Sequence, residues 1–149
     1  MTSLAIVTIM LTMCSCGSDS TQKAQELLEK ISSEYEGGKY EDALSDIDSL
    51  RKKFPEAIEQ RKEALKLYQD AALKMAQGDL MRIDSALQVT KSGYEKLKAE
   101  VEAHKEAGLA TAEELTRLTL TKMKVDSLQN KFDAYVSRVK FIHKKQAED

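Results

Sequence analysis

Mostly apolar residues in the second half of the chain recur at alternating intervals of three and four, and this spacing restricts the fold more than any other feature. The first series is Leu80, Ile83, Leu87, Thr90, Tyr94, Leu97, Val101 and His104. The second series is Leu118, Thr121, Val125, Leu128, Phe132, Tyr135, Val139 and Ile142. Helices with such a heptad seam pack against one another as coiled coils.

A short connection separates the two series. The chain turns through residues 106–110, and Thr111 and Glu114 then have the Ser/Thr-x-x-Glu spacing of a capping box that begins a new helix. Because the connection is short, we expect an antiparallel coiled-coil hairpin over residues 79–149. At about 1.5 Å per residue, its helices would reach roughly 40–50 Å. We interpret His104 as a tolerated polar residue of the seam rather than a catalytic base.

The region before the hairpin also has helical periodicity, and we expect helices over residues 21–36, 39–53 and 56–77. The first ends at Gly37 and Gly38, Pro55 closes the second, and the third ends at Gly78. The expected core-facing residues are Ala24, Leu27, Leu28, Ile31 and Tyr35, then Tyr40, Ala43, Leu44, Ile47 and Leu50, then Ile58, Leu65, Tyr68, Ala72 and Met75.

Composition agrees with an all-α fold class. The chain has one proline and six glycines, too few for the frequent turns of a β-sandwich or barrel. Its 23 basic and 25 acidic residues nearly cancel, which argues against a nucleic-acid partner bound by bulk positive charge.

A weak internal repeat lies within the helical region. A shift of 40 residues superposes Ala24 on Ala64, Leu27 on Leu67, Gly38 on Gly78, and Ala43 on Ile83. The first copy, with Gly38, Tyr40, Ala43, Leu50 and Pro55, resembles a tetratricopeptide repeat (TPR), and the stretch 35–55 resembles segments of outer-membrane assembly lipoproteins built from such repeats. The resemblance implies TPR-like helical hairpins over residues 21–78, followed by the coiled-coil hairpin. The second copy lacks the alanine and the proline, and any two amphipathic helix pairs can align in this way.

The N-terminal segment has the features of a targeting signal. Residues 1–16 carry no charged side chain, and the apolar run 4–13 is too short to cross a hydrocarbon core of about 30 Å but suits a signal-peptide core. The junction Ser15, Cys16, Gly17 resembles the lipobox of bacterial lipoproteins, where a small residue precedes the acylated cysteine. Cys14 fits less well because Met13 precedes it. A buried N-terminal helix with two incidental thiols is the alternative.

The lipobox resemblance implies a signal peptide over residues 1–15, lipid attachment, including palmitate, at Cys16, and a short linker over 16–20. Gly17 in that family is associated with passage to the outer membrane, so we expect a bacterial cell-envelope lipoprotein facing the periplasm. Two departures are Met13, where the family prefers leucine, and the absence of an early lysine or arginine. Either the start lies upstream of Met1 or the free amino group supplies the charge.

Catalytic and metal-binding motifs are absent from the sequence. It contains neither a zinc-binding His/Cys motif nor a phosphate-binding glycine loop, so we expect no cofactor, no metal site and no enzymatic activity. Paired carboxylates such as Glu34/Glu36 and Asp46/Asp48 are interpreted as salt-bridged surface. A basic run lies near the C-terminus and consists of Arg138, Lys140, His143, Lys144 and Lys145. It could bind anionic headgroups or an acidic partner, or its cations could simply complement the macrodipole at a helix end.

Two classes of function remain. In the first, the helical region binds a protein partner and the lipid anchor holds it at the membrane. In the second, the protein is a structural spacer or a self-associating coiled coil that forms a homo-oligomer without a specific groove. An exposed aromatic surface around Tyr35, Tyr40 and Tyr68 would favour partner binding, whereas burial of these rings would favour the spacer.

Overall fold

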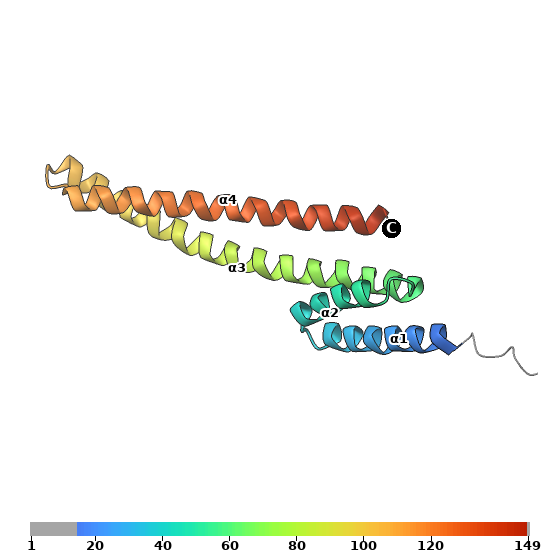
Figure 1. Cartoon of the computed structure of the whole chain (residues 1–149). Helices are drawn as coiled ribbons and strands as arrows, with labels where there is room; N and C mark the ends of the chain where they lie inside the picture. Colours follow the sequence, from blue (N-terminus) through green and yellow to red (C-terminus); the bar gives the residue numbers. More distant parts are fainter. Residues whose placement is uncertain (1–14, 149) are drawn as a thin grey trace, which may run out of the picture. The chain divides into compact units, whose positions relative to one another are not determined.

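The computed structural model describes the backbone of residues 15–148 and their side chains from residue 19 onward, and over this range it is all-α, as the sequence predicts (Figure 1). Its helices are α1 (Ser15–Glu36), α2 (Tyr40–Lys53), α3 (Ile58–Glu106) and α4 (Ala112–Glu148). The chain divides into two compact units, one up to Ala71 and one from Ala72 onward. α3 contributes its first part to one unit and the rest to the other.

The first unit is built around the hairpin of α1 and α2. Gly38 turns the chain with a φ of 73°, a left-handed conformation that glycine adopts without steric cost. The Lys39 N–H donates to the Glu34 carbonyl at 2.8 Å, which satisfies an end of α1. The core of this unit comprises Ala24, Leu28, Ile31, Ala43, Ile47, Leu50, Ala57 and Ala64.

The face that α3 presents to this core differs from the predicted one. Ala57 and Ala64 pack in the core, whereas Ile58, Leu65 and Tyr68, which were expected to point inward, are exposed. The alanines recur every seven residues and lie on the same side of the helix. The core therefore takes the alanine side of α3, and the larger apolar residues on the neighbouring side remain in contact with water.

The predicted helix end at Gly78 is wrong, because α3 continues from Ile58 to Glu106 without interruption. A single glycine costs a helix about 1 kcal/mol relative to alanine, which long flanking helical segments can absorb. Gly37 and Gly38 terminate α1 because the second glycine adopts positive φ, whereas Gly78 does not. The boundary expected between residues 78 and 79 is therefore not a break in secondary structure.

The N-terminal predictions are only partly within the described residues. α1 begins at Ser15, so residues 16–20, expected as a linker, are helical. The predicted signal peptide, apart from Ser15, lies outside the described residues, as does Cys14. For Cys16 the structure describes the backbone only, so lipid attachment there stays a prediction.

The second unit is the predicted antiparallel hairpin of α3 and α4 (Figure 1). Ala76 packs near Ile142, Lys91 Nζ donates to Gln129 Oε1 at 2.9 Å, and His104 pairs with Glu114. Residue numbers in these pairs rise along α3 as they fall along α4, which defines the antiparallel register. All sixteen residues of the two predicted seams are buried or half-buried. The 37 residues of α4 correspond to a length of about 55 Å.

Candidate interaction surfaces

The three tyrosines singled out in the sequence are arranged in two different ways. The rings of Tyr35 and Tyr40 contact one another with centroids 5.6 Å apart, and Tyr35 packs against the core of the first unit. Burial raises the pKa of the Tyr35 phenol. Tyr68 is instead partly exposed, with the Arg51 guanidinium 5.0 Å from its ring centroid. The expected aromatic surface is thus reduced to Tyr68, because Tyr35 and Tyr40 are half-buried structural residues.

A mixed apolar and basic surface surrounds Tyr68 on the first unit. A shallow hollow in this surface is lined by Arg51 of α2 and by four residues near the start of α3: Ile58, Arg61, Lys62 and Leu65. We call these residues together with Tyr68 the α2–α3 patch. Ile58 is 57% exposed, and Leu65 and Tyr68 follow it at helical spacing along the same side of α3.

The charged members of the α2–α3 patch are held by local contacts. Arg61 Nη1 donates to the Pro55 carbonyl at 2.6 Å, and Lys62 Nζ lies 2.9 Å from a carboxylate oxygen of Glu59. Arg51 stacks on Tyr68 through a cation–π contact. Each of the three cations therefore already has a local contact on the surface of the first unit.

Of the paired carboxylates of the first unit, Glu34, Asp46 and Asp48 take part in salt bridges, as expected for them. Lys30 Nζ of α1 lies 2.6 Å from Asp46 Oδ2 of α2 and 3.4 Å from Glu34 Oε1. The hydrogen bond to Asp46, followed by that to Glu34, raises the pKa of the Lys30 ammonium. The other carboxylate oxygen of Glu34 is buried without a hydrogen-bond partner. In the part of the chain that the structure describes, no group of three or more His, Cys, Asp or Glu could hold a metal ion.

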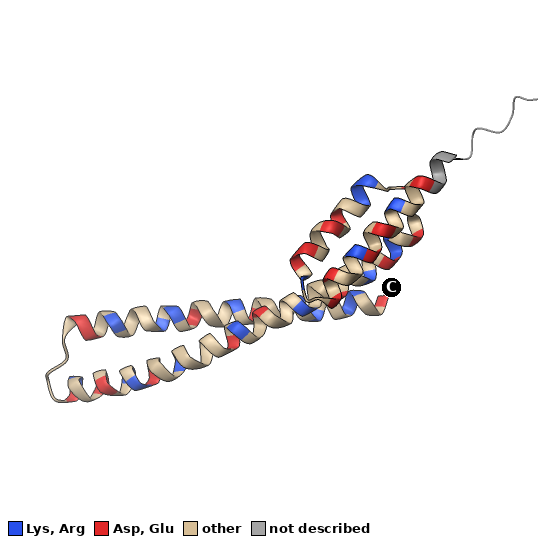
Figure 2. Cartoon of the chain, turned by 90° about the horizontal axis from the view of Figure 1, so that it is seen from below, with Lys and Arg blue, Asp and Glu red and all other residues tan. Residues whose placement is uncertain are grey.

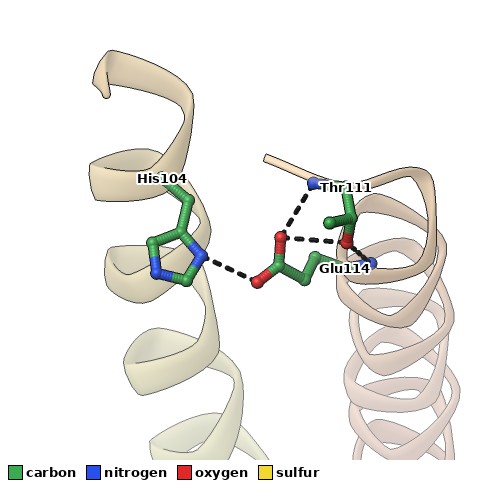
Figure 3. Close-up of polar contacts among 3 residues, drawn as sticks. All are labelled: His104, Thr111 and Glu114. Atoms are coloured by element: carbon green, nitrogen blue, oxygen red, sulfur yellow. Dashed lines mark hydrogen bonds and ion pairs between the residues drawn. The ribbon is translucent and has the colours of Figure 1, made fainter. Parts of the chain in front are cut away.

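His104 occupies the polar seam position that the sequence predicts, and its partner belongs to the capping box (Figure 3). His104 Nδ1 lies 2.7 Å from Glu114 Oε1. The other oxygen of Glu114 accepts from the Thr111 N–H at 2.9 Å, and the Glu114 N–H donates to Thr111 Oγ1 at 3.2 Å. The Thr111 backbone N–H, with His104 second, lowers the pKa of the Glu114 carboxyl. This arrangement joins the start of α4 to the end of α3, which is a structural role.

The C-terminal basic run is partly neutralised within α4. Lys145 Nζ lies 2.7 Å and Lys144 Nζ 3.8 Å from carboxylate oxygens of Glu148.

Between residues 15 and 148, no helix combines the length and the apolar character that a membrane crossing requires.

Comparison with known proteins adds no relative: no family model, no curated protein and no solved structure matches the chain. Function therefore has to be argued from the residues of this chain alone. Sequence reasoning missed the α2–α3 patch because it grouped Ile58 and Leu65 with the core-facing residues, and for Tyr68 it left burial or exposure open. The heptad spacing of Ala57, Ala64 and Ala71 was the signal that could have identified the true core face.

Proposed function

We propose that this protein is a lipid-anchored module of the bacterial cell envelope that binds a protein partner through the α2–α3 patch. The observation that carries the proposal is that Ile58, Leu65 and Tyr68 are exposed together on the first unit, outside its buried apolar core. Isolated exposed apolar residues are ordinary, but a cluster of them with an arginine on a tyrosine has the composition of a binding hot spot.

The partner expected at this patch is a protein segment with an apolar face and acidic edges. Apolar side chains would cover Ile58 and Leu65, and carboxylates would meet Arg51, Arg61 and Lys62 at the rim. A helix is the simplest segment of this kind, because its side chains repeat at the spacing of the α3 residues.

The lipid anchor is proposed from the junction of Ser15, Cys16 and Gly17. Each buried CH₂ of an acyl chain contributes about 0.8 kcal/mol, so several chains hold a protein at the membrane essentially permanently. Gly17 after the cysteine and the absence of a strongly acidic cluster there favour the outer membrane and its periplasmic face.

We also propose that α1, α2 and the start of α3 form a degenerate TPR-like unit. Ala43 is fully buried and Gly38 makes the turn between paired helices, which supports the resemblance for the first copy. The second copy of the 40-residue repeat has no turn at Gly78, so any TPR-like character is confined to the first copy.

One pair of variants tests the partner-binding surface. Ile58→Ser combined with Leu65→Ser removes the apolar centre of the patch, and Val89→Ser, at a residue of the second unit that is 74% exposed, is the matched control. After mild chemical crosslinking in native envelopes, we expect the double variant to lose heterologous adducts that the wild type and the control retain. Adducts of equal yield in all three proteins would contradict the proposal.

A separate fractionation experiment tests the anchor. Cys16→Ala removes the proposed acylation site and should move the protein from the membrane pellet to the soluble fraction, whereas Cys14→Ala should leave it in the pellet. Retention of the Cys16→Ala protein in the membrane pellet would refute lipid attachment at this residue.

A further inference from the structure

α4 carries a second stripe with three–four spacing on the side opposite its seam. The stripe lies two residues beyond each seam residue from Leu118 to Val139, about 200° around the helix, and the position two residues beyond Ile142 is Lys144. It consists of Leu120, Met123, Ser127, Asn130, Ala134, Ser137 and Phe141, with Thr116 preceding them. All eight residues are uncharged and exposed, and Leu120, Met123 and Phe141 are each 60% exposed or more. We call these eight residues the outer stripe.

The outer stripe is unusual for the surface of this hairpin. Basic and acidic residues are interspersed along the lengths of α3 and α4 (Figure 2). The corresponding positions on α3, also two residues beyond its seam, include the charged residues Arg82, Lys96 and Glu106. An exposed helix face without charge over this length indicates that another element covers it.

Two of the four polar side chains of the outer stripe form hydrogen bonds within α4. Thr116 Oγ1 donates to the Ala112 carbonyl at 2.8 Å, and Ser137 Oγ donates to the Asp133 carbonyl at 2.9 Å. These hydroxyls are satisfied by their own helix, so removing them from water costs less than burying unpaired groups.

Two shallow hollows lie along the outer stripe, and their lining matches the sockets of a coiled coil. One is lined by Met123, Asp126, Ser127, Asn130, Lys131 and Ala134, and the other includes Glu113, Thr116, Arg117 and Leu120. In knobs-into-holes packing, each socket is formed by four residues at this spacing on one helix and receives a side chain from the facing helix. In a coiled coil formed by this face, side chains of the second helix would occupy these shallow hollows.

Four charges beside the middle of the outer stripe favour a parallel pairing of two copies over an antiparallel one. If Ser127 is an a position and Asn130 a d position, then Asp126 and Asp133 occupy g positions and Lys131 and Arg138 occupy e positions. In the described residues none of these four side chains belongs to an ion pair. In a parallel coiled coil each g residue faces the e residue of the next heptad on the other helix, five positions further along.

We propose that the outer stripe of α4 binds the outer stripe of a second copy of this chain, with the two α4 helices parallel and in register. Asp126 then faces Lys131 of the second copy and Asp133 faces its Arg138, and the two-fold axis repeats each pair. An antiparallel pairing would instead place the basic e residues Arg117, Lys124, Lys131 and Arg138 opposite one another, where like charges repel. Asn130 would meet its symmetry mate in the middle of the seam, where a polar side chain specifies register at a cost in stability.

Photo-crosslinking in the full chain, expressed in its own envelope, tests this pairing. A photoreactive phenylalanine analogue replaces Ser137 on the outer stripe, or Ser92 on α3 as an equally exposed control. We expect a dimer adduct from position 137 only, with the crosslink mapping to residues 134–141 of the second copy. A crosslink mapping to residues 116–123 would show antiparallel pairing and overturn the proposal, as would equal dimer yields from both sites or none from either.

A charge exchange provides an independent measurement on the purified full-length protein at low ionic strength. Asp126→Lys should weaken dimerisation about tenfold, because two symmetry-related attractive pairs become repulsive. Asp126→Lys combined with Lys131→Asp should restore the wild-type dimer to within about threefold. Unchanged or tighter dimerisation of Asp126→Lys would contradict the parallel arrangement, and circular dichroism establishes that each variant remains helical.

Discussion

The buried seam of the hairpin can be tested by placing the same substitution at two valines of α3. Val101 is a seam residue with no exposed surface, whereas Val89 is 74% exposed on the same helix. Substitution of either by aspartate changes intrinsic helix propensity equally, so the difference between the two variants isolates the environment of the side chain. The seam interpretation predicts a large difference.

The expected magnitude follows from burial. Removing a fully buried valine forfeits about 1.5–2 kcal/mol of apolar transfer, and a carboxylate left in the seam adds about 1–3 kcal/mol of unsatisfied desolvation. Val101→Asp should therefore lower the free energy of unfolding by about 4 kcal/mol, and Val89→Asp should change it by less than about 0.5 kcal/mol. For a chain of 149 residues the first value corresponds to a Tm lower by about 8–16 °C.

Thermal melts followed by far-ultraviolet circular dichroism on the full chain measure both variants. The wild type is the reference, and urea titration gives the free energies independently. Equal Tm values for Val101→Asp and Val89→Asp would refute the seam, because a residue that is truly buried between α3 and α4 cannot tolerate the carboxylate as well as an exposed one does.

Two further predictions concern helix continuity and the start of α4. Gly78→Ala should raise the free energy of unfolding by about 0.5–1 kcal/mol, because an added Cβ at this position inside α3 meets nothing within 4 Å. Gly38→Ala should instead lower the free energy of unfolding by about 1 kcal/mol, because residue 38 has a positive φ. Destabilisation by Gly78→Ala would indicate that α3 is broken at this residue. The pKa of Glu114 is lowered from its ordinary value of 4.5, so its carboxylate stabilises the folded state fully above that pH and loses the effect as the pH falls through the lowered pKa. Glu114→Gln should therefore melt below the wild type at pH 7, and the two melts should converge in acid; a difference that is constant from pH 7 to pH 3 would argue against the ionised cap.

The hairpin could be predicted in detail because its information is local. Every seam residue from Leu80 to His104 and from Leu118 to Ile142 is buried or half-buried, as its spacing predicts. Thr111 and Glu114 mark the start of α4 through a capping hydrogen bond that does not depend on tertiary contacts. A short connection then leaves an antiparallel neighbour as the simplest packing.

The α2–α3 patch could not be predicted in this way because two faces of α3 compete. Ile58, Leu65 and Tyr68 bring more apolar area than Ala57 and Ala64, and a rule based on side-chain hydrophobicity places the larger residues inside. The structure instead buries the alanines in a cluster with residues of α1 and α2. Gly78 was misleading for a different reason: one glycine costs a helix only about 1 kcal/mol, which the long helical segments on either side absorb.

The outer stripe of α4 is also present in the sequence, but its composition conceals it. Ser127, Asn130, Ala134 and Ser137 separate Leu120 and Met123 from Phe141 along the stripe. An apolar pattern therefore does not emerge unless the absence of charge is counted. The hydrogen bonds that return Thr116 and Ser137 to their own helix become evident only from the three-dimensional structure.

The measurement that tests partner binding most directly is photo-crosslinking from the centre of the α2–α3 patch. A photoreactive phenylalanine analogue in place of Tyr68 preserves an aromatic ring there, and the same analogue at Val89 is the control. Irradiation of intact envelopes should give a discrete adduct from position 68, and peptide mass mapping should identify a protein other than a second copy of this chain. No adduct from position 68, or the same adducts from positions 68 and 89, would contradict the proposed interaction surface.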